Sequence, residues 1–260
     1  MRAKKSYGQH FLINEAIAAD IAASLEIVDG CNTVVEVGPG KGMLTKYLMK
    51  QDYKLLAIEA DRDMASYLHS NYPELEGKVI QEDFLKVDLR KVLGKEPFAI
   101  IGNFPYNISS QILFKMLEYK ELVPELVGMF QKEVGMRVAA PHGSKTYGVI
   151  SVLIQAYYEP FILMDVDKSE FDPPPKVQSV VIRLKRKASQ DLGCDYKLFR
   201  TVVKLAFSQR RKMLRNTMKS LIKGNEMLQE AFFRQRPEQL SVDDFIQLTN
   251  RIEANLPKEN

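Results

Sequence analysis

Residues 100–106 read Ile100-Ile101-Gly102-Asn103-Phe104-Pro105-Tyr106, and the predicted fold is organised around this stretch. Two β-branched residues indicate the end of a buried strand. Pro105 cannot donate a backbone hydrogen bond, so the strand must end near it. We therefore expect Asn103 and Tyr106 at the carboxyl end of a strand, which is where an open α/β sheet binds its ligands.

The groups at this strand end suit the transfer of a group to a planar amine. The lone pair of an aromatic exocyclic amine is delocalised into the ring, which makes the amine a poor nucleophile. The side-chain carbonyl of Asn103 and the backbone carbonyl of Phe104, held by Pro105, can accept the amine hydrogens and localise that lone pair. Tyr106 can stack on a flat base. Taken alone, however, these residues are more typical of a strand-to-helix turn, and only the sequence on both sides favours the methyl-transfer interpretation.

Strand-like and helix-like segments alternate on both sides of this stretch. Strands are expected at residues 33–37, 54–58, 78–81, 98–101 and 126–130, with helices between them. The alternation predicts an α/β fold with a doubly wound, mostly parallel sheet. Gly38, Glu59, Asp83 and Asn103 follow the first four strands, so all four are expected at the ligand-binding edge.

A glycine-rich turn follows the first strand. Gly38, Gly40 and Gly42 allow the backbone to turn tightly and approach a ligand closely. The G-x-G-x-G spacing and the acidic Glu36 argue against a nicotinamide dinucleotide, whose pyrophosphate Glu36 would repel. Glu59 lies about 20 residues past the glycines, where a carboxylate accepts ribose hydroxyls.

Asp83 adds a further acceptor, and the sulfonium cation of S-adenosylmethionine (SAM) fits such an acidic pocket. We therefore predict SAM as the cofactor. Separately, Glu59 and Asp83 could also be helix caps or solvated loop charges.

The composition is that of a globular protein: 260 residues, 45% hydrophobic and 27% charged. No apolar stretch approaches the ~20 residues of a membrane span. Residues 1–5 are basic but lack the apolar stretch of a secretory signal. Cys31 and Cys194 form no redox or metal motif, and the three histidines form no ligand cluster. We expect a cytoplasmic protein with no metal site and no membrane partner.

The net charge of +4 is concentrated in the C-terminal part. The first 187 residues hold 24 basic and 24 acidic residues, whereas the remainder holds 13 and 9. Residues 197–223 contain nine basic residues and no acidic one. A one-sign stretch among apolar residues indicates a polyanion partner rather than a merely solvated helix. The expected RNA contacts are Lys204, Arg210, Arg211, Lys212 and Arg215.

Strand-like sequence ends near Lys187. Before it, two β-like segments flank a proline-rich loop at residues 171–176. After it, helices are expected at residues 199–221, 226–233 and 242–252, the last capped by Ser241 with Asp244. We therefore predict a methyltransferase domain at residues 1–187 and a small all-α, RNA-binding domain at residues 188–260.

With these residues in view, the chain resembles the KsgA family of ribosomal RNA small-subunit adenine-N6,N6-dimethyltransferases nearly from end to end. The resemblance rests on Gly8-Gln9-His10-Phe11-Leu12, Glu36-Val37-Gly38-Pro39-Gly40, Glu59, Glu82-Asp83, Asn103-Phe104-Pro105-Tyr106-Asn107-Ile108-Ser109, Gln131-Lys132-Glu133-Val134, Phe171-Asp172-Pro173-Pro174-Pro175-Lys176-Val177 and Phe207-Ser208-Gln209-Arg210-Arg211-Lys212.

This resemblance implies a Rossmann-like enzyme that dimethylates two adjacent adenosines in a hairpin loop of small-subunit (16S) rRNA during ribosome assembly. The partner would be rRNA within an immature subunit, and we expect a monomer. SAM would be held at His10, Leu12, Gly38, Glu59, Asp83 and Asn103. The family usually has Asn where this chain has His10, and commonly Leu where it has Phe104.

For the mechanism we expect in-line methyl transfer, with the base stacked between Tyr106 and Phe171. Phe171 is almost equally compatible with a place in the core. Two alternatives remain: a large-subunit rRNA adenine methyltransferase of the antibiotic-resistance type, and a non-catalytic ribosome assembly factor on the same fold. Residues 171–177 and 207–212 favour the small-subunit family, and the intact residues 103–106 argue against the non-catalytic alternative.

Overall fold

The computed structural model describes residues 4, 7–27, 30–222 and 226–255. Lys223, which the predicted basic stretch includes, and residues 1–3 and 5 of the basic N-terminus lie outside them. The chain divides into two compact units. The first comprises residues up to Gly135 together with Glu159–Arg186, and the second comprises Met136–Tyr158 together with residues from Lys187 onward. One division between the units falls at Lys187, and residues 136–158 group with the second unit, whereas the sequence analysis placed them in the first domain.

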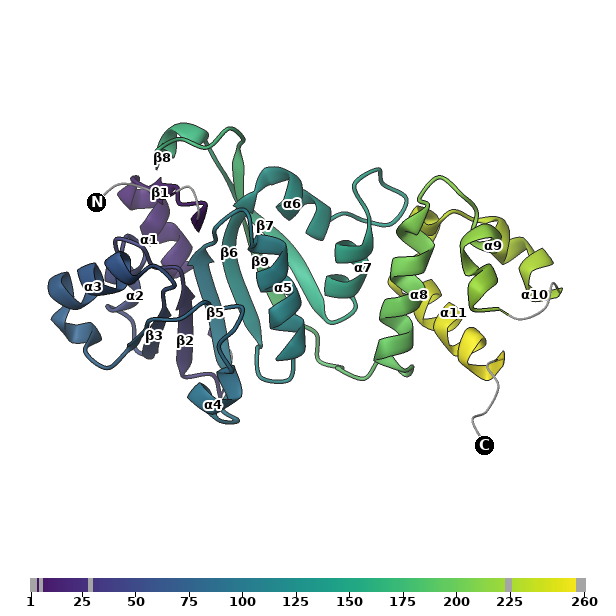
Figure 1. The fold of residues 1–260 in the computed structure, drawn as a ribbon, viewed down its shortest axis with the longest axis horizontal. Coiled ribbons are helices and arrows are strands. Elements are labelled where there is room, and N and C mark those ends of the chain that lie inside the picture. Colours follow the sequence, from purple (N-terminus) through teal and green to yellow (C-terminus); the bar gives the residue numbers. More distant parts are fainter. Residues whose placement is uncertain (1–3, 5–6, 28–29, 223–225, 256–260) are drawn as a thin grey trace. The chain divides into compact units, whose positions relative to one another are not determined.

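The first unit contains a sheet whose strand order confirms the predicted class (Figure 1). The order is β4 (Val79–Ile80), β3 (Lys54–Ile58), β2 (Thr33–Val37), β5 (Phe98–Asn103), β6 (Glu125–Gln131), β9 (Ser179–Arg186) and β7 (Tyr158–Val166). The first five strands in this order are parallel, and β9 runs antiparallel to β6. Parallel strands are buried on both faces, which is why Val34, Ile100 and Val127 are fully buried.

Helices connect these strands, and some of them begin at a local sequence signal. They are α1 (Glu15–Ala23), α2 (Thr45–Leu48), α3 (Arg62–Asn71), α4 (Leu89–Leu93), α5 (Ser109–Glu118) and α6 (Lys132–Val138). Two of these helices begin at a capping side chain: Asn14 accepts hydrogen bonds from the backbone N–H groups of Ala16 and Ile17, and Asp61 accepts one from Asp63. Capping fixes where α3 begins, just after Glu59.

A second, two-stranded sheet joins the N-terminal segment to the proline-rich loop. β1 (Phe11–Leu12) pairs antiparallel with β8 (Phe171–Asp172), which follows the short 3₁₀ helix η3 (Lys168–Glu170). The backbone N–H of Ile13 also donates to the Glu170 carbonyl at 2.9 Å. Segments about 160 residues apart in the sequence are thereby held side by side.

The second unit is helical apart from the start of β7. It contains α7 (Val149–Gln155), α8 (Tyr196–Ser208), α9 (Leu214–Thr217), α10 (Glu226–Gln229) and α11 (Val242–Asn255), with 3₁₀ turns at Met218–Ser220, Ala231–Arg234 and Pro237–Gln239. The buried residues of α7 pack against those of α8, which explains why residues 136–158 belong to this unit. The predicted capping box is confirmed, because Ser241 and Asp244 exchange hydrogen bonds.

The prediction of one continuous helix at residues 199–221 is wrong. α8 ends at Ser208, and the next helical turn begins only at Leu214. Tertiary hydrogen bonds act in this gap: the Leu214 N–H donates to the Gln235 carbonyl, and the Arg210 side chain binds backbone carbonyls. Such contacts override a continuous helical propensity.

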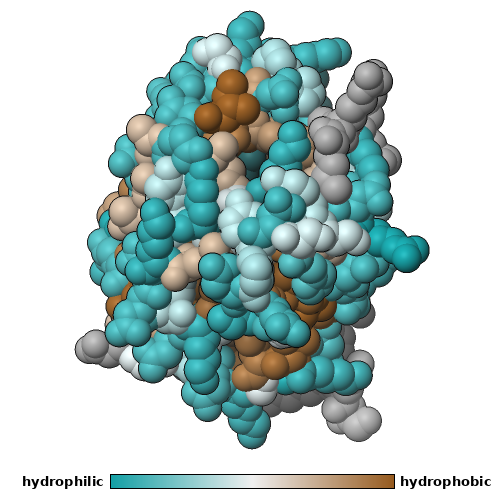
Figure 2. Space-filling view, turned by 90° about the vertical axis from the view of Figure 1, so that its left-hand side faces the viewer, coloured by the Kyte–Doolittle hydropathy of each residue, from teal (hydrophilic) through white to brown (hydrophobic). Residues whose placement is uncertain are grey.

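None of the helices in the described part of the chain is long and apolar enough to span a membrane. On the face drawn in Figure 2, hydrophilic side chains predominate, and hydrophobic ones form separate areas rather than one continuous patch.

Candidate active site

A cavity of about 540 Å³ lies in the first unit at the carboxyl ends of the parallel strands. The residues predicted to bind the cofactor all line it, as do four of the five predicted to act in catalysis, with Asn103 in both groups: His10, Leu12, Gly38, Gly40, Glu59, Asp83, Asn103, Phe104, Pro105 and Tyr106. Their roles remain predictions, but the sheet brings them to one place.

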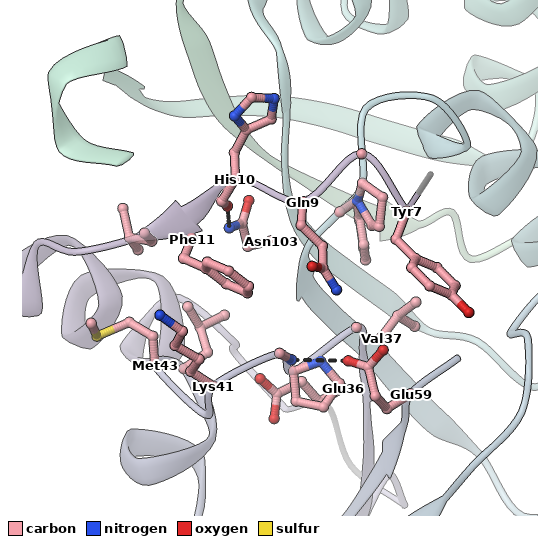
Figure 3. Close-up of a pocket in the computed structure, with 18 of the residues that line it drawn as sticks. Tyr7, Gln9, His10, Phe11, Glu36, Val37, Lys41, Met43, Glu59 and Asn103 are labelled. Carbon is pink, nitrogen blue, oxygen red and sulfur yellow. Dashed lines mark hydrogen bonds between the residues drawn. The ribbon is translucent and has the colours of Figure 1, made fainter. Parts of the chain in front are cut away.

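The glycine turn forms one wall of this cavity. Gly38 and Gly40 have φ values of +67° and +57°, which other residues rarely adopt. A Cβ atom at Gly40 would lie 3.2 Å from the Phe11 ring, so a larger residue there would push into the cavity wall. The Gly40 N–H donates to Glu59 Oε2 at 3.0 Å, which ties the turn to the end of β3 (Figure 3).

Glu59 is held rigidly and is only 5% exposed. Its other oxygen, Oε1, accepts the Asp61 N–H at 2.8 Å. Each carboxylate oxygen retains a second acceptor position that a ligand hydroxyl can use. Burial raises the pKa of Glu59 despite these two backbone donors.

Glu36, which the sequence analysis treated as a negative charge, is mostly neutral in the folded protein. Its side chain is fully buried at the end of β2 and accepts a hydrogen bond from Thr45 Oγ1 at 2.7 Å. Burial raises the pKa of Glu36 to about 8, against the effect of Thr45 and with a further contribution from the charge of Glu59. The carboxyl is therefore mostly neutral at pH 7, and the pocket is less negative than its count of acids suggests.

The Asp83 end of the cavity includes Phe84, which sequence reasoning missed. Asp83 Oδ1 accepts the Leu85 N–H at 3.0 Å, and the adjacent Phe84 is buried against the cavity. Behind Phe84, Lys115 on α5 donates to the Val87 carbonyl at 2.6 Å and lies 5.6 Å from the centroid of the Phe84 ring. Phe84 could have been identified by its position directly after Asp83.

Asn103 is oriented by the N-terminal segment. Its Nδ2 donates to the backbone carbonyl of His10 at 3.0 Å, as Figure 3 shows, which leaves Oδ1 as the acceptor end of the amide. The Phe104 ring lies in the core, edge-on to Phe130 with centroids 5.1 Å apart, in space that Gly102 and Gly128 leave open. Only the backbone of Phe104 is left to act at the site.

Tyr106 completes this side of the cavity. Its hydroxyl shares a hydrogen bond with Ser179 on β9, and burial raises the pKa of its phenol. Ser179 was not among the predicted site residues, although it fixes the Tyr106 ring at its far end.

The N-terminal segment covers the cavity and is anchored by charge. Lys4 Nζ lies 2.7 Å from both Asp61 and Asp63, and Gln9 Nε2 donates to Asp61 at 3.1 Å. Tyr7, Gln9 and Phe11 line the cavity in consequence. The signal for Gln9 and Phe11 was their place within the Gly8–Leu12 motif, and Tyr7 directly precedes that motif.

Phe171, which was expected to face the base, lies in the core of this structure. Its side chain is 2% exposed and packs among apolar residues with Leu12, its partner in the β1–β8 pair. An aromatic ring next to two core elements gains more from burial than from exposure.

The predicted RNA contacts lie in the second unit, and one of them has a structural partner. Arg210 donates to the carbonyls of Tyr147 at 2.6 Å and Ser144 at 3.0 Å. Lys204, Arg211 and Lys212 are exposed, and Arg215 is half-buried. Lys197, Arg200 and Lys204 share one face of α8 and border a shallow hollow there.

In the described ranges, no three or more His, Cys, Asp or Glu side chains lie together as a metal ion would require.

Comparison with known proteins gives a consistent family relationship. The family model described as ribosomal RNA adenine dimethylase matches residues 1–254. The chain is 51% identical to the ribosomal RNA small subunit methyltransferase A of Flavobacterium johnsoniae, with 98% of this chain and 97% of the relative covered. It is 49% identical to the protein of the same name from Phocaeicola vulgatus, with 98% and 91% covered.

Solved structures agree with this. A dimethyladenosine transferase from Plasmodium falciparum superposes with a TM-score of 0.80 at 25% identity, covering 95% of this chain and 98% of the other. The 23S rRNA methyltransferase ErmE gives a TM-score of 0.69 at 23% identity, with 94% and 99% covered, and shows a shared fold.

Proposed function

Because this chain belongs to the ribosomal RNA adenine dimethylase family, we propose that it acts on two adjacent adenosines in a hairpin loop of small-subunit rRNA. The protein is a SAM-dependent methyltransferase that dimethylates adenine in 16S rRNA. We also propose which residues perform the reaction and that it takes place on an immature small ribosomal subunit.

One observation carries the assignment of the site: acceptors from four strand ends converge on a single cavity with a glycine wall. The residues fit SAM. The buried Glu59 carboxylate can accept ribose hydroxyls, the Gly38–Gly40 backbone allows close approach, and Asp83 provides an acceptor farther along. His10 and Leu12 line the same cavity. When bound, SAM supplies an electrophilic methyl group.

The reaction then requires the protein to position and polarise the target amine. Asn103 Oδ1 and the Phe104 carbonyl accept the two amine hydrogens, which localises the lone pair on nitrogen. The hydrogen bond from Asn103 Nδ2 to His10 prevents the amide from presenting its donor end instead. Tyr106, fixed by Ser179, offers its ring to the extruded base.

The second unit is proposed to bind the rRNA backbone. Lys204, Arg211 and Lys212 are exposed, and within the described residues no acidic group forms an ion pair with them. Such unpaired like charges favour a polyanion. The proposed partner is an immature small subunit, met in the cytoplasm by a single copy of the enzyme.

A methyl-transfer assay tests this proposal. Small subunits, large subunits and free rRNA lacking the modification are incubated with tritium-labelled SAM, and the modified base is mapped. We expect two dimethylated adenosines in the small subunit. Label that appears only in the large subunit, or in no substrate, would overturn the proposal.

A further inference from the structure

One lysine on the wall of the cofactor cavity takes no part in the proposed reaction. Lys41 directly follows the Gly38–Gly40 turn and lines the cavity. Its side chain is half-buried, and its Nζ lies 4.6 Å from the centroid of the Phe11 ring, which also lines the cavity. Figure 3 shows this amine on the Phe11 side of the pocket, with the carboxylate of Glu59 on the other side. The cavity therefore carries a positive charge across from the carboxylate proposed to bind the ribose.

The backbone of Lys41 is fixed by the turn in which it lies. The Gly42 N–H donates to the Pro39 carbonyl at 2.9 Å. The Tyr72 hydroxyl donates toward the carbonyl oxygens of Lys41 and Gly42, at 3.2 and 3.3 Å. Gly42 has a φ of +80°, and a Cβ atom there would lie 2.6 Å from the Tyr72 ring. These contacts hold the start of the Lys41 side chain in one place on the cavity wall.

The amine of Lys41 has no acidic partner in the part of the chain that the structure describes. Lys46, another lysine on the cavity wall, binds Glu15 instead. Glu36 at the end of β2 is mostly neutral at pH 7, because burial raises its pKa to about 8. Asp172 lines the cavity as well, but it forms no ion pair with Lys41 among the described residues. The charge of Lys41 is therefore available to a ligand.

The order of the strands indicates which part of SAM lies near Lys41. Adjacent strands are about 4.8 Å apart, and Asp83, Glu59 and Gly38 follow the neighbouring strands β4, β3 and β2. With the ribose at Glu59, the adenine and the amino-acid part extend in opposite directions along this edge. Only an amino-acid part on the β2 side brings the methyl group toward Asn103, which ends the next strand, β5. The amino-acid part then passes the glycine turn, next to Lys41.

We propose that Lys41 binds the α-carboxylate of SAM and so contributes to recognition of the amino-acid part of the cofactor. This rests on the proposed cofactor site. A carboxylate that leaves water for a cavity requires a cation or several hydrogen-bond donors. The ammonium group of a lysine supplies a charge and three donors. The face of the Phe11 ring attracts the same ammonium group and holds it at the cavity before the ligand binds.

Isothermal titration calorimetry without RNA tests this proposal. S-adenosylhomocysteine (SAH) carries the α-carboxylate of the cofactor, whereas decarboxylated SAH keeps the ammonium group and lacks the carboxylate. Both ligands are titrated into wild type, Lys41→Met, Lys41→Arg and Lys46→Met. Lys41→Met keeps an unbranched side chain against Phe11 but removes the charge. Lys46→Met is the matched control, because Lys46 lines the same cavity and is bound to Glu15.

Wild type should bind SAH about tenfold more tightly than decarboxylated SAH, the lower end of the range for a hydrogen bond to a charged group, because Lys41 is only half-buried. In Lys41→Met this preference should disappear: the affinity for SAH decreases about tenfold, and the affinity for decarboxylated SAH does not decrease. Lys41→Arg should retain most of the preference, since arginine also carries the charge. Lys46→Met should match wild type.

A preference for SAH that persists in Lys41→Met, or that is absent from wild type, would overturn the proposal, because other groups would then recognise the carboxylate or none would. Equal losses of affinity for both ligands in Lys41→Met would also overturn it, because the lysine would then support the cavity wall. So would a preference that is lost in Lys46→Met and kept in Lys41→Met. Wild-type protein that binds neither ligand would contradict the proposed cofactor site, which is a separate result.

Discussion

The neutral carboxyl of Glu36 predicts a specific dependence of stability on pH. The folded pKa of Glu36 is about 8, whereas the ordinary value is 4.5. Well below pH 4.5 the carboxyl is neutral in both the folded and the unfolded protein, so its ionisation does not affect the free energy of unfolding. As the pH rises, the unfolded chain ionises first, so the free energy of unfolding decreases until the folded pKa is passed.

The magnitude follows from these two values. Between pH 5 and pH 8, Glu36 lowers the free energy of unfolding by about 3.5 kcal/mol, because each pH unit between the two pKa values corresponds to about 1.4 kcal/mol and the effect levels off near both. Glu36→Gln does not ionise, yet its side-chain carbonyl can still accept the hydrogen bond of Thr45. The stability of the variant relative to wild type should therefore increase by about 3.5 kcal/mol from pH 5 to pH 8.

Urea unfolding of both proteins at pH 5.0, 6.5 and 8.0, without SAM, measures this difference directly. The slopes with urea concentration should agree between the two proteins, which controls for changes in the unfolded state. Parallel stability profiles for wild type and Glu36→Gln would refute the reasoning, because Glu36 would then ionise equally in both states.

Three further predictions concern the site and the RNA contacts. Glu59→Ala should weaken SAM binding about 10- to 150-fold in calorimetry, through loss of a charged acceptor worth about 1.5–3 kcal/mol; an unchanged dissociation constant in a folded variant would contradict the ribose assignment. Phe171→Ala should lower the free energy of unfolding by about 3–5 kcal/mol, as for a core aromatic; a stable variant that fails only in base capture would restore its stacking role. Arg211→Gln with Lys212→Gln should weaken small-subunit binding and flatten the slope of log affinity against log salt by about 0.7–0.9 per contact, leaving stability intact. Arg210→Gln is the matched comparison and should instead destabilise the second unit, because it loses the carbonyls of Tyr147 and Ser144.

The parallel part of the sheet and the position of the site could be predicted from local sequence patterns. Hydrophobic periodicity marks each buried strand, and polar residues directly after the strand mark its carboxyl end. Because parallel strands end at one edge, Gly38, Glu59, Asp83 and Asn103 had to lie close together, and they line one cavity. Helix caps were equally accessible, since the interactions of Asn14 and Asp61 span only a few residues.

The surroundings of the carboxyl ends of the strands depend on tertiary contacts that local sequence patterns do not predict. Whether Phe171 faces a base or the core depends on its pairing with Leu12, far away in the sequence. The break after Ser208 and the partners of Arg210 depend on segments about 60 residues upstream and 20 downstream. The stacking of His10 on Tyr106 follows from the β1–β8 pair and Pro173. Local patterns report which residues prefer burial, but the partner that buries or orients each one is chosen by packing between distant segments.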